Sequence, residues 1–585
     1  MELISSARST PSDLARPTNT PFLNCPLVHV HRFTTSHHHR KSSVEQQAWR
    51  RRSSGRQTSK ATYGKSYYHS SLPVENLLIV VDTRPGLPKR FQSFLFFQIQ
   101  KPDLFKSRLK QFVSDGHITT AAQACEMKDV ISGAQKLFKS SGKKAPLLPL
   151  PGVNIAFASS GLHKLGKFVQ TSDQQAVQSD PALLKIFRRN QLRGAQFEVG
   201  MFEDLVGEGW DNPQDLRPEY QPSHVPGRDR RQIDGVLLVT SSVQSDILEH
   251  VKSVTQHFLD DGVVTFPLVR EGHVRPGDAK GKEHFGYADG LSQPFIKGLD
   301  DTLPNAKLPT NKEPKAMDAG FILCGHKGDP MKQPAWSNDG SFLVIRDLQQ
   351  MVPEFEEWLQ KNGPKAPFCQ GSDKPAEKLA AYLMGRWRNG TPVHESPHSD
   401  EDESLHASNN FDYEPRNQHD KCPFAAHTRK MRPRSDLSHD HTVIIRRGIP
   451  YGPEVSDGEK AAKTSDTAAE RERGLIFACY QSDIRSGFNF LTTRWASQHH
   501  YPNGKHESVG VEGPGIDPIV GQRLDHHPPR LIALPDGEVP TKHRMELESW
   551  VNHKGGEYFF SPSIEAIMGY LTGPSDYDLP PKAKL

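Results

Sequence analysis

The 585-residue chain has 35% hydrophobic and 24% charged residues with 46 prolines and 45 glycines, a composition that excludes a coiled coil or fibre and is typical of a loop-rich globular protein. Its net charge is +4, but residues 1–70 hold 11 Lys and Arg against 3 acidic residues, and the rest holds 62 against 66. We therefore expect a disordered basic tail over residues 1–74 and no nucleic-acid binding, because the basic residues lie in a Ser- and His-rich segment without apolar periodicity.

The cysteines and the hydropathy pattern exclude further classes. Six scattered cysteines form no CxxC or CxxCH motif, so neither a zinc ribbon nor a covalently attached c-type haem is expected, and a disulfide scaffold is disfavoured. No run of about 18 apolar residues predicts a membrane span. The N-terminus lacks the apolar core of a secretory signal, which favours the cell interior, with secretion as the open alternative.

Residues 75–300 read as a first strand-and-helix unit. SFLFFQI at 93–99 predicts a buried strand, and a second strand at 153–158 precedes a Ser-capped helix. GVLLVTS at 235–241 predicts a third strand, followed by a helix at 245–259. That helix places four apolar residues on one face: Ile247, Val251, Val254 and Phe258.

Residues 301–575 repeat this pattern, before a tail at 576–585. The strands are SFLVIRDL at 341–348, TVIIRRG at 442–448 and GLIFACY at 474–480, with a helix around PEFEEWL and a helix start at SDIRSGFNFL. The alternation indicates two α+β sandwiches packed together, each an antiparallel sheet with helices on one side. Three long polar connections are expected to be functional or disordered: residues 394–420, 453–473 and 501–543.

Three polar positions could carry chemistry, and each also has a simpler explanation. Asp289 lies on a tight turn in HFGYADGLSQPFIKG, where an aspartate most often bonds its own backbone. His427, in DKCPFAAHTRKMRPR, could equally be a core or surface histidine. Arg446 and Arg447 end an apolar strand and point to opposite faces, so one is expected to point inward, toward an acid, a cofactor or a ligand.

Taken together, the ordered segments are more specific. GYADGLSQP, CPFAAHTRKMRPR and IIRRGIPYG, followed by GLIFACYQSDI and GGEYFFSPS, resemble the dye-decolorizing (DyP-type) haem peroxidases, in particular the fungal-like members. LPLPGVNIAFASSGLHKLG and EGHVRPGDAKGKEHFGYADG are also similar to that family, so the resemblance runs from about residue 85 to about residue 570. One departure is ENLLIVVDTRP at the expected first strand, which predicts that this strand is altered.

The resemblance implies a dimeric α/β barrel of two ferredoxin-like subdomains, with one haem b per chain in the C-terminal half. It assigns His427 as the axial iron ligand, and Asp289 and Arg446 as the catalytic pair. The other implied site residues lie around the cofactor: Leu475, Phe477 and Asp517. Asp517 in GIDPIVG would bond the far ring nitrogen of the histidine, which fixes its tautomer and strengthens electron donation to iron.

The function implied is reduction of hydrogen peroxide coupled to one-electron oxidation of phenolic or dye-like aromatic substrates. Asp289 would move the peroxide proton, Arg446 would stabilise developing negative charge, and the low intrinsic pKa of aspartate predicts an acidic rate optimum. Trp495 and Tyr451 are candidates for surface oxidation of bulky dyes, against ordinary packing as the alternative. The competing interpretations are a non-catalytic haem-binding or haem-transfer protein and a related haem enzyme acting on another small oxidant. A homo-oligomer is also left open.

Overall fold

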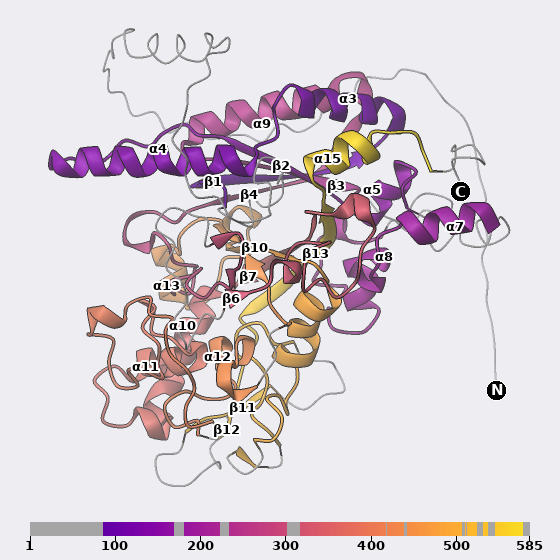
Figure 1. Cartoon of the computed structure of the whole chain (residues 1–585). Helices are drawn as coiled ribbons and strands as arrows, with labels where there is room; N and C mark the ends of the chain where they lie inside the picture. The colour runs from indigo at the N-terminus through magenta and orange to yellow at the C-terminus, as the bar shows by residue number, and fades with distance from the viewer. Residues whose placement is uncertain are drawn as a thin grey trace, which may run out of the picture. The chain divides into compact units, whose positions relative to one another are not determined.

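The computed structural model describes residues 86–576 apart from 169–180, 223–232, 301–315, 417, 438–440, 506–508, 511, 523–529 and 536–543 (Figure 1). The predicted basic tail and the altered first strand lie outside these residues, as do residues 577–585. No helix in the described part of the chain combines the length and the hydropathy that crossing a bilayer requires.

The N-terminal half is a ferredoxin-like βαββαβ unit. Its strands are β1 (Phe91–Ile99), β2 (Gly152–Phe157), β3 (Gly235–Ser241) and β4 (Val264–His273). They pair antiparallel in the order β4-β1-β3-β2. The helices of this half are α3 (Pro102–Ser114), α4 (Ala121–Ser140), α5 (Ser159–Lys164), α7 (Pro181–Asn190), α8 (Ala195–Val199), the π-helix η3 (Phe202–Val206) and α9 (Gln244–Leu259).

The C-terminal half repeats that topology with longer insertions. Its strands are β7 (Ser341–Gln350), β8 (Ile445–Arg446), β9 (Ile449–Tyr451), β10 (Gly474–Gln481) and β13 (Val551–Ser561), in the order β13-β7-β10-β8 with β9 also pairing β10. Its helices are α10 (Val352–Asn362), α11 (Pro375–Met384), α12 (His427–Met431), α13 (Asp457–Ala462), α15 (Ile564–Ala566) and the π-helices η15 (Arg485–Asn489), η16 (Leu491–Ala496) and η17 (Ile567–Leu571). Two short pairs stand apart: β5 (Phe295–Ile296) with β6 (Ala316–Met317), and β11 (Leu531–Ala533) with β12 (Arg544–Glu546).

The two half-sheets join into one barrel. β2 pairs with β13 at Phe157 and Phe560, which makes a continuous nine-stranded sheet among the described residues. At the opposite edges β4 approaches β9 so closely that a Cβ on Gly272 would lie 2.3 Å from Ile449 Cγ2. The predicted fold of two ferredoxin-like halves is thus confirmed, and the predicted boundary near residue 300 falls between β4 and β7.

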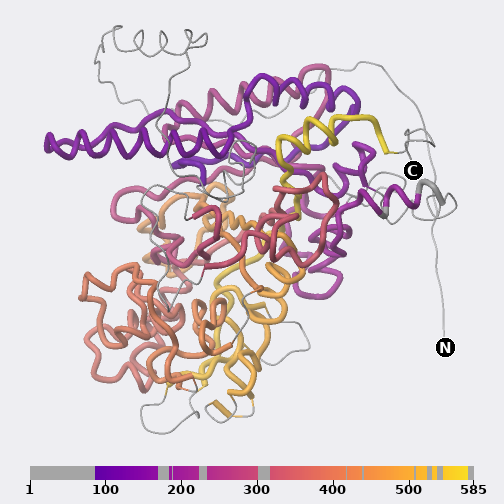
Figure 2. The backbone as a smooth tube through the Cα atoms, in the orientation of Figure 1, coloured from indigo at the N-terminus to yellow at the C-terminus, as the bar shows by residue number. Residues whose placement is uncertain are grey.

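The outer face of the N-terminal sheet is covered directly by helices (Figures 1 and 2). Phe97 of β1 meets Phe105 of α3 with ring centroids 5.6 Å apart, and Phe105 meets Phe258 of α9 at the same distance. Ile247 and Val254 of α9 are buried too, while Val251 is only partly buried against the core, as the helical periodicity predicts. This face is therefore dry and closely packed.

Several local predictions need correction. The helix after β2 is not Ser-capped: Ala158 is its N-cap residue, and the Ser159 and Ser160 hydroxyls, inside the helix, donate to the carbonyls of Glu198 and Ile233. The strand expected at 442–448 is only the two residues of β8, because the chain leaves the ladder at Gly448 and returns as β9. The helix start expected after β10 forms the π-helical turns η15 and η16.

Parts of the long polar connections and of the predicted C-terminal tail are also ordered. The 453–473 connection contains α13 with a complete capping box between Ser456 and Glu459. Asp576, assigned to the tail, is buried and accepts from Lys167 Nζ at 2.8 Å. All five cysteines among the described residues are free thiols. Buried ion pairs and caps therefore order segments whose composition alone suggested loops.

Candidate active site

A cavity of about 290 Å³ lies against the C-terminal half-sheet. One wall is the face of β7, β10 and β13 that carries Arg346, Leu348, Phe477 and His553; the alternation of side chains along a strand puts them on the same side. The other walls come from the segment 287–294, from α12 and from η16. The cavity thus brings together residues that lie far apart in the sequence.

The segment before Asp289 is a rigid platform. The buried carboxylate of Glu283 accepts from the backbone N–H groups of Phe285 and Tyr287, each at 2.9 Å, and from Gln350. Gly286 has a φ of +93°, which favours glycine, and lies against the Arg388 side chain. These bonds fix the backbone on which Asp289 stands.

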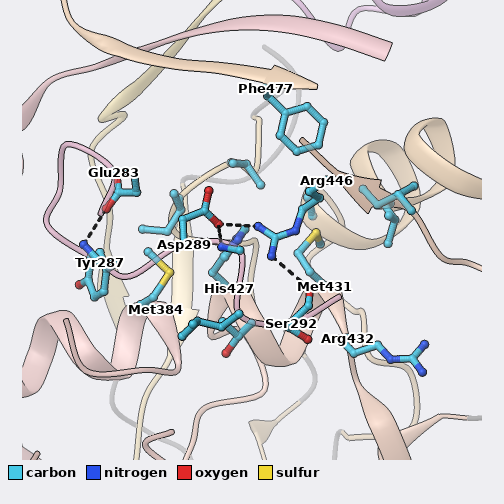
Figure 3. A pocket seen from close by; sticks show the side chains of 18 of the residues that line it. Glu283, Tyr287, Asp289, Ser292, Met384, His427, Met431, Arg432, Arg446 and Phe477 are labelled. Atoms are coloured by element: carbon cyan, nitrogen blue, oxygen red, sulfur yellow. Dashed lines mark hydrogen bonds and ion pairs between the residues drawn. The ribbon is translucent and has the colours of Figure 1, made fainter. Parts of the chain in front are cut away.

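Asp289 and Arg446 form an ion pair inside the cavity (Figure 3). Asp289 Oδ1 accepts from Arg446 Nη1 at 2.8 Å and from the Gly290 N–H at 2.6 Å. Arg446 Nη2 also donates to the Ser292 carbonyl at 3.2 Å. Among the described residues, Asp289 Oδ2 has no hydrogen-bond partner, so this oxygen can exchange a proton with a ligand in the cavity.

The charge of Asp289 is set by its neighbours. Burial opposes ionisation, but the Arg446 guanidinium and the Gly290 N–H outweigh it and hold the pKa of Asp289 below its ordinary value. The side chain is 36% exposed, and that exposure is to the cavity. Asp289 therefore stays a carboxylate under mildly acidic conditions.

Arg446 and Arg447 point to different surroundings. Arg446 lines the cavity, whereas the Arg447 guanidinium lies against Gly86, where a Cβ would be 3.1 Å from Arg447 Cζ. The backbone of Arg446 is pinned from both sides by Gln293, which accepts from its N–H at 3.1 Å and donates to its carbonyl at 3.0 Å. The first arginine of the pair is thus the one held beside Asp289.

His427 is the first residue of α12 and lines the same cavity as the Asp289–Arg446 pair; all three are labelled in Figure 3. Its Nδ1 lies 2.8 Å from Oδ2 of Asp517, and Asp517 Oδ1 accepts from the N–H groups of Ile519 and Val520 at 2.8 and 3.0 Å. Burial works against the charge of Asp517, but His427 and these backbone donors lower its pKa. His427 Nε2 has no hydrogen-bond partner in the described part of the chain.

The two apolar residues expected beside the cofactor, Leu475 and Phe477, both line this cavity. Sequence reasoning missed the basic and aromatic residues at another of its edges. Arg386 is 5% exposed and lines the cavity. It donates hydrogen bonds to the Gly390 and Ser408 carbonyls and to the Asn409 side chain. Burial, with Arg434 and Arg446 nearby, lowers its pKa to about 10.

Aromatic rings of the 394–420 connection hold this basic edge in place. The Arg434 guanidinium carbon lies 3.9 Å from the centroid of the Phe411 ring, and Arg386 lies over the same ring at 5.5 Å. Phe411 and Tyr413 also line the cavity. The sequence feature that could have predicted these lining residues is the FDY cluster inside an otherwise polar segment.

Trp495 and Tyr451 were expected to lie at the surface, and this prediction is wrong because both side chains are buried. Trp495 is 2% exposed and stacks on Tyr501 with ring centroids 4.7 Å apart. Tyr451 is 4% exposed, and its hydroxyl donates to Glu472 at 2.8 Å. Trp495 lies in the π-helical η16 and Tyr451 in β9, and both elements turn these rings into the core rather than outward.

The fold is that of the dimeric α+β barrel proteins. The chain matches the family models "DyP dimeric alpha+beta barrel domain" over residues 79–276 and "Dyp-type peroxidase, C-terminal" over residues 381–508. It is 34% identical to the dye-decolorizing peroxidase of Exidia glandulosa, with 84% of this chain and 86% of that protein aligned. It is 33% identical to dye-decolorizing peroxidase AauDyP1 of Auricularia auricula-judae over the same shares.

Solved structures agree with these sequence relatives. An ancestral D-type dye-decolorizing peroxidase superposes with a TM-score of 0.71 at 34% identity, covering 86% of this chain and all of that chain. A triple mutant of the Auricularia auricula-judae enzyme superposes with a TM-score of 0.68 at 31% identity and the same coverage. The chain therefore belongs to the DyP-type peroxidases, a family of haem enzymes, and is a peroxidase.

Proposed function

We propose that this protein binds one haem b per chain in the cavity, reduces hydrogen peroxide there, and oxidises phenolic or dye-like aromatic compounds in one-electron steps. The observation that carries the proposal is that one cavity is lined by the Asp289–Arg446 pair and by His427, which is bonded to the buried Asp517 behind it. The names of the relatives support the substrate class, because they are called dye-decolorizing peroxidases.

The lining of the cavity fits haem. Leu348, Leu475 and Phe477 supply apolar surface, and His427 Nε2 is an imidazole nitrogen open to the cavity, which is the donor that haem iron takes in peroxidases. Arg386 is a buried guanidinium whose bonds, within the described residues, include no carboxylate. A buried cation of this kind needs an anion, and the haem carboxylates would provide one.

When bound, the haem would supply the iron and the electrons for breaking the peroxide O–O bond. Asp289 Oδ2 would accept the proton of the first peroxide oxygen and return it to the leaving oxygen, while Oδ1 stays bonded to Arg446 and Gly290. Arg446 would stabilise the negative charge on the separating oxygen. Asp517 would keep the proton on His427 Nδ1 and leave Nε2 as the donor.

The alternative of haem storage or transfer needs only His427 and is weaker on one point. Asp289 is an ionised group whose open oxygen faces the same cavity, and binding alone has no use for it. Since its pKa lies below the ordinary value, we expect peroxide cleavage to continue into the acid range, past the ordinary aspartate pKa of about 3.9.

The test uses the full chain reconstituted with haem. We expect a Soret band typical of histidine-ligated ferric haem, its loss or shift in His427→Ala, and peroxide-dependent oxidation of a phenol and of a bulky dye. Absence of a Soret band after reconstitution would remove the proposal. A normal Soret band without peroxide turnover would favour the haem-binding alternative.

A further inference from the structure

A buried tyrosine stands directly behind the wall of the cavity. Tyr558 of β13 is 1% exposed, and its ring centroid lies 6.1 Å from that of Phe488. Phe488 lines the cavity and lies 6.2 Å from Phe477, measured between centroids. Tyr558 is thus separated from the cavity by the thickness of a single side chain.

The hydroxyl of Tyr558 has a carboxylate as its acceptor. It donates to Asp204 Oδ2 at 2.6 Å, and Asn489 Nδ2 donates to the same oxygen at 2.8 Å. Burial raises the pKa of Asp204, and this outweighs the two hydrogen bonds. A buried carboxylate with that affinity for protons can take the phenol proton at the moment the ring loses an electron.

Two other tyrosines also donate to carboxylates, but cations surround them. Tyr451 donates to Glu472, which pairs with Arg217, and the Arg270 guanidinium carbon lies 4.4 Å from the Tyr451 ring centroid. A cation on the ring and another on the acceptor both oppose loss of an electron and transfer of the proton.

Tyr570 is in the same situation. It donates to Asp576 at 2.6 Å, but Lys167 Nζ pairs with Asp576 at 2.8 Å and lies 4.1 Å from the Tyr570 ring centroid. Asp204, by contrast, pairs with no cation in the described part of the chain. The cation that acts on Tyr558 is Arg346, and its charge is offset by its own ion pair with Asp211 at 2.9 Å. Of the three pairs, the Tyr558–Asp204 pair is the one arranged for oxidation.

We propose that Tyr558 is a redox-active tyrosine that holds one of the oxidising equivalents left in the cavity by peroxide, with Asp204 as its proton acceptor. Tyr558 gives one electron to the peroxide-oxidised cofactor, and its hydroxyl proton moves to Asp204 Oδ2. The products are a neutral tyrosyl radical and a neutral carboxylic acid. An electron from the reducing substrate and the proton from Asp204 then restore the phenol. The inference rests on the proposed function, because that reaction supplies the oxidant.

Burial explains why the proton must move with the electron. A phenol that lost only an electron would leave a cation inside the core, which is costly in a medium of low polarity. Transfer to Asp204 removes that charge and also neutralises the carboxylate. The 2.6 Å hydrogen bond means that the proton has only a short distance to move between the two oxygens.

The test is freeze-quench electron paramagnetic resonance on the haem-loaded full chain, mixed with one equivalent of hydrogen peroxide and no reductant. Incorporation of ring-deuterated tyrosine identifies a tyrosyl signal by its narrowing. We expect the wild-type signal to be lost in Tyr558→Phe and strongly reduced in Asp204→Asn, because an amide cannot accept the proton. Tyr570→Phe, the matched control, should keep it.

Peroxide consumption and the Soret band, recorded on the same samples, separate the two proposals. A wild-type protein that consumes peroxide but forms no tyrosyl radical, or an undiminished signal in Tyr558→Phe, would overturn this inference and leave the proposed function standing. A wild-type protein that does not consume peroxide would overturn both. If Tyr558→Phe does not take up haem, the Asp204→Asn signal decides: undiminished intensity refutes the role of the pair.

Discussion

The two halves of the barrel have the same strand order but use their outer sheet faces differently. In the N-terminal half, Phe97 of β1 packs directly under α3 and α9. In the C-terminal half, the corresponding first strand, β7, presents Arg346 and Leu348 to a cavity. The same topology therefore gives a dry core where helices cover the sheet, and a site where long insertions stand off from it.

The insertions explain the difference. In both halves a helix follows the first strand within three residues, α3 after β1 and α10 after β7, so the difference arises later in the chain. In the C-terminal half, the segment between α11 and β8 carries α12, the aromatic residues Phe411 and Tyr413, and the basic edge of the cavity. Chain inserted at this connection thus supplies His427 and the basic edge of the cavity without altering the sheet, whereas Asp289, Arg446 and Asp517 come from other segments.

The largest effect should come from the site. Asp289→Asn removes the proton acceptor but keeps the shape, so we expect the rate of peroxide cleavage to fall by about 10² to 10⁴. Stopped-flow spectra of the haem-loaded protein measure this rate, and the thermal unfolding midpoint should hardly change. Near-normal cleavage would refute the role given to Asp289.

A substitution in the closely packed N-terminal face should lower stability rather than activity. Phe105→Ala removes a ring that packs against Phe97, Phe157 and Phe258, and we expect the free energy of unfolding to fall by about 3–5 kcal/mol. Denaturant titration measures the change. Activity per folded molecule should stay the same, and a loss of activity at full stability would contradict the division between the halves.

Removing a large side chain from the cavity wall should lower the free energy of unfolding less than removing one from the closely packed N-terminal face. Phe477 is only partly buried because one side of its ring faces the cavity, so Phe477→Ala in the haem-free protein should lower the free energy of unfolding by about 2 kcal/mol. The same denaturant titration makes the comparison. A loss equal to that of Phe105→Ala would mean that the cavity wall is packed as tightly as the N-terminal core.

The C-terminal insertion should also make stability depend on pH. Burial lowers the pKa of His419 from 6.5 to about 4, and its ring stacks on Phe424 with centroids 5.3 Å apart. The unfolded chain therefore binds the proton first, and between pH 6.5 and 4 the free energy of unfolding should fall by roughly 1.4 kcal/mol per pH unit from this residue.

The change His419→Phe keeps a ring beside Phe424 and removes the titrating group. Denaturant titrations at several pH values should therefore give a flatter pH dependence for this variant than for the wild type. An identical slope would show that His419 is not the group that links stability to pH in this range.

Much of the architecture could be predicted from sequence because it depends on local patterns. The apolar runs that became β1, β3, β7 and β10 are short, β-branched or aromatic, and bounded by turn residues. The 442–448 run failed as a prediction because a strand's length is decided by its partners, and β10 pairs with only two of its residues. The predicted surface exposure of Trp495 and Tyr451 was wrong because exposure depends on which other segments pack over a side chain.

The order of the main strands and helices and the residues that carry the family's motifs could be predicted from the sequence alone, because hydrophobic periodicity and turn chemistry are local properties. Tertiary structure decided which of these residues meet: Asp289 bonds Arg446 across 157 positions, and His427 bonds Asp517 across 90. It also decided that Asp204, unlike Glu472 and Asp576, has no cation beside it among the described residues. The strength of an electrostatic interaction depends on distance in space and on burial, and neither is written in the local pattern.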